Sequence, residues 1–164
     1  MIIYLKNKHT LEVDDFKFRC SIGKNGKSKK KKEGDKKTPL GQFAIENLYY
    51  RSDRIQKPFT NLKCIKIQKN MGWCDDPKSK KYNMLITYPF SFGAERLYRN
   101  DNIYDVIIVL NYNMDPITKN KGSAIFIHIA KKNFTSTEGC VGIKKKDMKK
   151  IVRTIDKKTK VEIS

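Results

Sequence analysis

The sequence contains no apolar run approaching the ~18 residues that a membrane-spanning helix needs. Its first six residues are too short and become polar too soon to predict a secretory signal. By these features alone the chain would remain in the cytoplasm, unless a leader precedes it. A length of 164 residues suits one domain with one core.

Acidic residues are few, with 17 Asp and Glu against 36 Lys and Arg, for a net charge of +19. Such a charge attracts polyanions such as nucleic acid, anionic lipid or an acidic wall polymer. The lysines are spread along the chain, which favours a solvated basic surface over a specific nucleic-acid site. The densest lysine run, at 24–37, has no interleaved aromatic residue and predicts a mobile loop.

Cysteine is also scarce, and none of the four residues, Cys20, Cys64, Cys74 and Cys140, forms a C-x-x-C pair or a zinc-type spacing. If Cys140 must stay free, three remain, so a complete disulfide framework is not predicted. Cys20 and Cys64 are interpreted as small buried apolar residues.

What is present is mostly β-type patterning, in one domain spanning 1–164. A continuous β-branched run at 104–112 predicts a central strand buried on both faces. Apolar residues at helical spacing predict one amphipathic C-terminal helix at 145–157 with a lysine-rich outer face. Other strands are expected at 2–5, 11–22 with a turn at 14–15, 43–48, 62–67, 84–90 and 159–163. Turn-forming residues dominate 71–77, and 91–102 is a mixed segment in which a helical turn is possible.

Two aromatic stretches are candidates for a binding wall. Tyr50, within the stretch 49–54, is interpreted either as part of a polar aromatic cleft or as a surface residue of a loop. Trp73, the single tryptophan, stands close to Asp75 and Asp76. It is interpreted either as a ligand contact or as a cap on the core beside Asx turns.

The strongest chemical signal is a histidine in a β-type run, 124–130, followed by a Gly-Cys pair. Strand alternation places His128 opposite three core isoleucines. An imidazole near Cys140 can accept its proton and activate the thiol. The amides of Gly139 and Cys140 are candidate oxyanion donors, and Thr137 a candidate substrate contact. By spacing alone, a buried histidine and an ordinary cysteine remain the favoured interpretation.

Three sequence blocks in order carry a family resemblance. Ile127-His128 is followed by Thr137-Glu138-Gly139-Cys140-Val141. Upstream lie a glycine-rich block at 23–26, Glu33-Gly34-Asp35 and then Thr38-Pro39-Leu40-Gly41-Gln42-Phe43. Between them stands Gly72-Trp73-Cys74-Asp75-Asp76-Pro77. Together they resemble the L,D-transpeptidase catalytic-domain family (YkuD-type), in a compact subgroup.

This resemblance implies a mainly β fold, a sandwich of mixed sheets, with Cys140 as nucleophile and His128 as base. Such enzymes attack peptidoglycan stem peptides after their third residue, forming a thioester. An amine of another stem then gives a 3→3 cross-link, or water gives an L,D-carboxypeptidase or amidase-like hydrolase. No metal or cofactor is implied, and the substrate implies the bacterial cell envelope. A monomer is expected.

Two positions depart from the family pattern. Glu138 stands where many members carry a second histidine, and Gly142 where an arginine is common. Arg96, Arg99 or Lys144 are candidate replacements for that arginine, and Arg96 is taken as a substrate-binding residue. A more distant alternative is a polyanion-binding protein without enzymatic activity.

Overall fold

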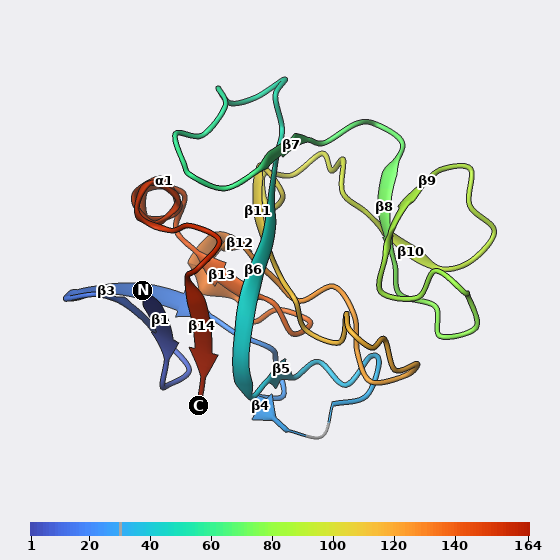
Figure 1. Ribbon diagram of the computed structural model, residues 1–164, viewed down its shortest axis with the longest axis horizontal. Coiled ribbons are helices and arrows are strands. Elements are labelled where there is room, and N and C mark those ends of the chain that lie inside the picture. Colours follow the sequence, from blue (N-terminus) through green and yellow to red (C-terminus); the bar gives the residue numbers. More distant parts are fainter. Residues whose placement is uncertain (30) are drawn as a thin grey trace.

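The structure is a computed structural model that describes residues 1–29 and 31–164, and it is mainly β (Figure 1). It contains a single α-helix among the described residues, α1 (Lys145–Thr154), and a short 3-10 turn, η1 (Lys132–Phe134). The strands are β1 (Ile2–Leu5), β2 (Thr10–Val13), β3 (Phe16–Ser21), β4 (Lys27–Ser28), β5 (Thr38–Pro39), β6 (Gly41–Tyr50), β7 (Cys64–Lys66), β8 (Met71–Cys74), β9 (Leu85–Thr87), β10 (Ala94–Arg96), β11 (Val106–Leu110), β12 (Phe126–Ile129), β13 (Val141–Ile143) and β14 (Lys160–Ile163).

Nine strands form one mixed sheet in the order β11-β12-β13-β3-β2-β1-β14-β6-β7. An additional pairing joins β11, the first strand of this order, to β6, the next-to-last, so the sheet curves around on itself. Strands β8, β9 and β10 form a separate small sheet, seen at the right of Figure 1. The mixed-sheet β fold expected from the sequence is therefore confirmed.

The first and last strands lie side by side, because β1 pairs in parallel with β14. Alternate residues of both strands, such as Ile3 and Leu5 on β1 and Val161 and Ile163 on β14, are fully or almost fully buried. This period-two pattern is what the sequence predicts for strands with one wet face.

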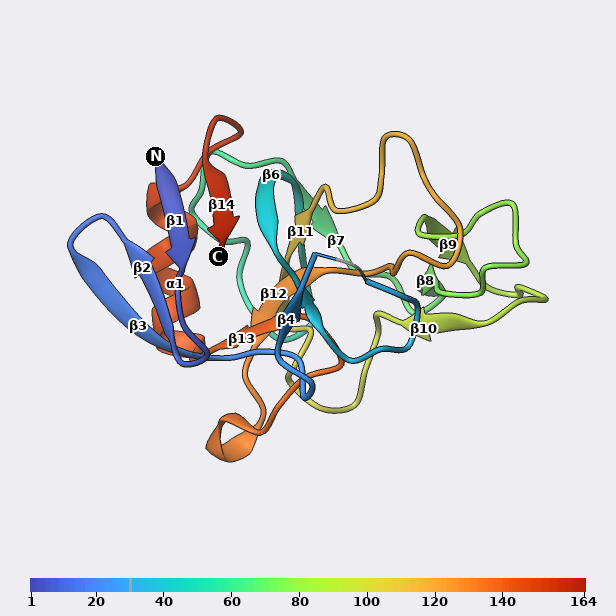
Figure 2. The same cartoon turned by 90° about the horizontal axis from the view of Figure 1, so that it is seen from below.

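The main apolar core lies on one face of this sheet and includes the buried face of α1. Helix α1 contributes Met148, Ile151 and Val152, while its lysines point outward. In the second view α1 lies behind β1 and β2, at the far end of the molecule from β8–β10 (Figure 2). The amphipathic helix is confirmed, although it ends at Thr154 rather than at residue 157.

Strand β11 is buried along its whole length, as predicted, and pairs with β12 on one side and β6 on the other. Residues of β11 and β12 alternate between two apolar clusters. Ile125, Ile127 and Ile129 face the main core. Phe126 instead joins a second cluster that includes Cys140 and Trp73.

Two local expectations are wrong. The stretch 71–77, rich in turn formers, contains β8, and the mixed segment 91–102 contains β10 instead of a helical turn. Each is held by pairing with the other, Ala94 opposite Cys74 and Arg96 opposite Gly72. Pairing between segments distant in sequence has overridden the local preference.

The lysine-rich segment expected to be a mobile loop at 24–37 contains β4, which pairs with β5. Lys31, within the same segment, is buried at 5% exposure. Residue 30 lies outside the described residues. Where the structure describes the chain, no helix is long and apolar enough to cross a membrane.

Candidate active site

Cys140 immediately precedes β13 and opens into a cavity of about 490 Å³. Its side chain is nearly buried, with 9% exposure. The thiol Sγ donates to the Ala124 carbonyl at 3.0 Å, and the Phe126 amide donates to the sulfur at 3.3 Å. The sulfur is thus held by one acceptor and one donor at the wall of a hollow.

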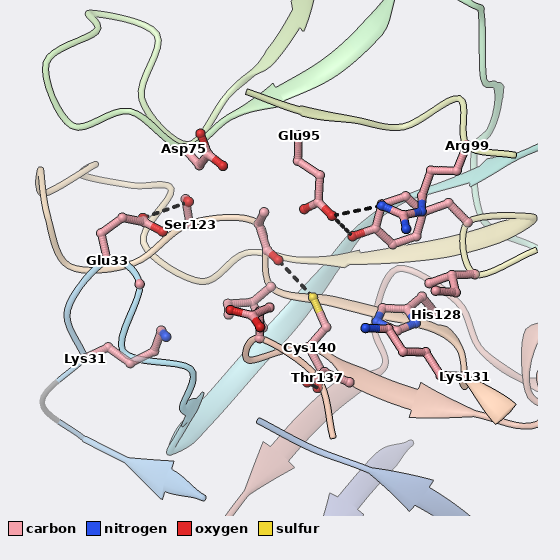
Figure 3. A pocket seen from close by; sticks show the side chains of 16 residues that line it. Lys31, Glu33, Asp75, Glu95, Arg99, Ser123, His128, Lys131, Thr137 and Cys140 are labelled. Carbon is pink, nitrogen blue, oxygen red and sulfur yellow. Dashed lines mark hydrogen bonds and ion pairs between the residues drawn. The ribbon is translucent and has the colours of Figure 1, made fainter. Parts of the chain in front are cut away.

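His128 lines the same cavity, one strand away on β12. Strands β12 and β13 run in parallel with Ile127 opposite Val141 and His128 opposite Gly142. In this register the side chains of His128 and Cys140 leave the same face of the sheet. Figure 3 shows the imidazole and the sulfur turned toward one pocket. The sequence-based expectation that His128 stands opposite the isoleucines is therefore confirmed.

The tautomer of His128 follows from its backbone contact. Nδ1 lies 2.9 Å from the Ile129 carbonyl, which can only accept, so Nδ1 carries the proton. When the ring is neutral, Nε2 is left with a free lone pair. The Tyr104 ring packs edge-on against the imidazole, with 5.5 Å between ring centroids, and fixes its orientation.

Burial sets the protonation of both groups. It lowers the pKa of His128 to about 4 and raises the pKa of the Cys140 thiol to about 12. At neutral pH the resting site therefore holds a neutral imidazole and a neutral thiol, not a thiolate–imidazolium pair. No hydrogen bond joins the two side chains within the described residues.

The turn that delivers Cys140 is locked by Thr137. Its Oγ1 donates to the Cys140 carbonyl at 2.6 Å and accepts from the Gly139 amide at 3.1 Å. The proposed oxyanion role of Gly139 therefore needs correction, because its amide already has an acceptor. Among the described residues the Cys140 amide has no acceptor, so it stays a candidate oxyanion donor.

Gly139 instead serves the packing of the turn. Its φ of +138° lies in a region that L side chains rarely adopt, and an added Cβ would lie 2.8 Å from the Lys37 carbonyl. Its own carbonyl accepts from the Thr38 hydroxyl at 2.8 Å. The upstream Thr-Pro block thus packs directly on the Gly-Cys turn.

The cavity walls carry charges of both signs. Glu33, Asp75, Glu95 and Glu138 supply acids, and Lys31, Arg99 and Lys131 supply cations. Burial raises the pKa of Glu95, which accepts from the Tyr104 hydroxyl at 2.7 Å and lies 3.8 Å from Arg99. Burial, reinforced by the neighbouring Glu33, also raises the pKa of Asp75. Such a lining is suited to a substrate that carries both an amine and a carboxylate.

Comparison with known families agrees with this geometry. A family model described as the L,D-transpeptidase catalytic domain (YkuD) matches residues 1–163. The chain belongs to this family. No curated protein and no solved structure matches it.

Within this L,D-transpeptidase-family domain, three of the expected substrate contacts lie away from the cavity. Trp73 is buried, donates from Nε1 to Asn83 Oδ1 at 3.0 Å, and packs edge-on against Phe126. Tyr50 is buried in the main core, at 3% exposure. Arg96 stacks over the Tyr88 ring. Their assignment as substrate contacts is corrected to structural roles.

Asp75 and Thr137 do line the cavity, and so does Arg99, one of the candidate replacements for the family arginine. Position 142 itself has no room for a side chain. A Cβ there would lie 2.6 Å from the Ser21 hydroxyl and 3.1 Å from Ala130 Cα. Glycine at 142 is thus required by close packing between β13, β3 and the end of β12.

Sequence reasoning missed Lys31, Glu33, Tyr104 and Ser123 as lining residues. Glu33 accepts from the Ser123 hydroxyl at 2.8 Å and from the Tyr82 hydroxyl. Its place in the Glu-Gly-Asp block was the signal that pointed to it. Lys31 carried no such signal, since it stands in a run of similar lysines.

Proposed function

We propose that this domain is a cysteine acyl-transferase that acts on peptidoglycan stem peptides, in the bacterial cell envelope. The observation that carries the proposal is that Cys140 and His128 open from the same sheet face into one cavity. Family membership supports the substrate class.

In the first half-reaction, Nε2 of neutral His128 accepts the thiol proton as Cys140 Sγ attacks a peptide carbonyl carbon. The thiol gives up its hydrogen bond to Ala124, while the Phe126 amide keeps donating to the sulfur and stabilises its developing negative charge. The Cys140 amide donates to the oxyanion. The C–N bond then breaks, the amine leaves with the proton from Nε2, and a thioester remains.

In the second half-reaction, an incoming amine or water attacks the thioester carbonyl and gives its proton to His128. The C–S bond breaks, and the proton returns to the sulfur. With an amine from another stem the product is a cross-link, and with water it is a shortened peptide. The low pKa of His128 keeps the ring an acceptor at the start of each half-reaction.

The acidic and basic side chains of the cavity support a substrate that carries both a positive and a negative charge. Glu33, Asp75 and Glu95 attract an acceptor that arrives as an ammonium ion. A neighbouring carboxylate then takes up its proton before the amine attacks, which suits the raised pKa values of Asp75 and Glu95. This acidic wall favours transfer to an amine over hydrolysis.

The direct test is incubation with tetrapeptide muropeptides and analysis of the products by mass. We expect cross-linked dimers, with shortened monomers as a minor product, and no conversion by Cys140→Ala. Cys64→Ala is the matched control, because Cys64 is a half-buried cysteine outside the cavity. Conversion by Cys140→Ala would refute the assigned nucleophile, and shortened monomers alone would favour a hydrolase.

A further inference from the structure

Lys31 differs from its neighbours in the lysine-rich segment. Lys24, Lys29 and Lys32 are exposed, whereas the Lys31 side chain is only 4% exposed and lines the cavity that holds Cys140. Burying an ammonium group is costly unless the group is paired and hydrogen-bonded. The fold must therefore compensate for the burial of this one cation.

The Lys31 ammonium forms an ion pair with Asp35, and backbone amides hold Asp35 in turn. Nζ donates to Asp35 Oδ1 at 2.7 Å and to the Lys37 carbonyl at 2.7 Å. Asp35 in turn accepts from the amides of Lys32 and Lys37, each at 2.9 Å. Burial alone would raise the pKa of Asp35, but these hydrogen bonds outweigh it and hold the pKa below its ordinary value. The anchor is thus charged at neutral pH.

Gly122 leaves the space that the lysine side chain needs at the cavity wall, and Gly139 lies in contact with its ammonium. A Cβ on Gly122 would lie 2.6 Å from Lys31 Cε, and a Cβ on Gly139 would lie 3.6 Å from Nζ. The ammonium therefore sits beside the turn that carries Cys140. In Figure 3 it points into the pocket from the side of Cys140 opposite His128.

One donor of this ammonium has no partner among the described residues. A lysine ammonium has three N–H donors, and Nζ has two acceptors among the described residues, Asp35 and the Lys37 carbonyl. The other cations of the cavity are less well prepared for an anion. Lys31 pairs with one carboxylate, whereas Arg99 pairs with two, Asp101 at 2.6 Å and Glu95 at 3.8 Å, and Lys131 is exposed on the His128 side.

We infer that Lys31 is the anion subsite of this cavity, and that its third N–H binds the free carboxylate of the amino acid expelled by Cys140. This inference rests on the proposed function and names the part of the substrate that the cavity recognises. The carboxylate of the leaving residue is one Cα from the scissile nitrogen, so it must lie close to the sulfur. Because Asp35 holds the ammonium in place, binding costs little side-chain entropy.

The test compares two donor peptides that differ only at the C-terminus, one with a free carboxylate and one with a carboxamide. Binding is measured by calorimetry in the Cys140→Ala background, so turnover is not required. We expect the carboxylate peptide to bind roughly ten- to a hundredfold more tightly than the carboxamide. In Lys31→Met this preference should disappear through loss of affinity for the carboxylate peptide alone.

Lys32→Met is the matched control, since it removes the same charge from an adjacent exposed position and should keep the preference. In Lys31→Met, Asp35 loses its ion-pair partner, which can destabilise the fold. The double variant Lys31→Met/Asp35→Asn removes both charges of the pair and avoids this cost. It too should lose the preference. Equal affinities in the parent, or an intact preference in the Lys31 variants, would overturn the inference. Lack of turnover by the unmodified enzyme would instead count against the proposed function.

Discussion

The two faces of β12 show how this sheet separates stability from chemistry. On one face Ile127 and Ile129 are buried among aliphatic side chains of the closed sheet and α1. On the other, Phe126 packs in a small aromatic cluster, and His128 reaches the charged cavity. Because neighbouring residues of one strand serve opposite faces, a single residue step changes a core position into a reactive one.

Burial of the cavity face also explains why Cys140 and His128 are neutral at rest. The cavity face of β12 is almost as buried as the core face, so charge is disfavoured on both Cys140 and His128. The surrounding ion pairs, such as Lys31–Asp35, are instead fixed by backbone amides. The charges of the cavity walls are thus fixed in ion pairs, while Cys140 and His128 stay neutral until a substrate arrives.

The largest effect is expected on the cavity face. His128→Gln removes the proton acceptor, and we expect acyl transfer to fall about a hundred- to ten-thousandfold. The free energy of unfolding at neutral pH should change much less than activity does. Product formation from muropeptides and denaturant unfolding measure the two quantities. Near-normal turnover would show that another group accepts the proton.

Trp73 separates stability from substrate binding, because it lies in the second apolar cluster, behind the cavity face, without lining the cavity. Trp73→Ala should cost about 3–5 kcal/mol of stability through the cavity left beside Phe126. At temperatures where the variant stays folded, KM for the donor peptide should be unchanged. A large rise in KM at unchanged stability would restore Trp73 as a substrate contact.

Acid stability tests the burial of His128 directly. Its pKa is about 4 in the folded protein and 6.5 in the unfolded chain, so the unfolded chain binds a proton that the folded protein does not. Stability should therefore be lost as pH falls from 6.5 to 4, by up to about 3 kcal/mol. The loss should be absent in His128→Gln. The same pH dependence of the free energy of unfolding in the parent protein and in His128→Gln, over this pH range, would contradict the account.

The smallest effect is expected at Arg96, on the edge of the small sheet. Arg96→Ala removes an exposed stack on Tyr88 and should cost less than about 1 kcal/mol. Turnover should be unchanged, because the side chain does not line the cavity. Arg99→Ala is its matched partner, since Arg99 does line the cavity and should raise KM. Equal effects of both variants would place Arg96 back at the site.

Much of this arrangement is predictable from the sequence, for identifiable reasons. Period-two and helical patterns determine β1, β11 and α1, because burial on one or both faces leaves a direct mark on residue order. A strand, a loop and a Gly-Cys turn mark His128 and Cys140 as candidates, and the family resemblance selects them as a pair. These signals are local, and local reasoning finds them.

What the sequence does not reveal depends on distant pairing. Strand β8 forms from a segment rich in turn formers, and β10 forms from a mixed segment, because the two strands pair with each other. Trp73 and Tyr50 have side chains typical of binding walls, but the closed sheet buries them. Lys31 is one of eight lysines between 24 and 37, and only the fold distinguishes it, through Asp35 and the space at Gly122.

The central claim is that His128 activates the Cys140 thiol within one cavity. It is tested most directly by incubation with a β-lactam of the carbapenem type, followed by mass analysis of the intact protein and its peptides. The account predicts one covalent adduct, on Cys140, forming at least about a hundredfold more slowly in His128→Gln. An adduct on Cys20, Cys64 or Cys74, or an unchanged rate in the histidine variant, would contradict it.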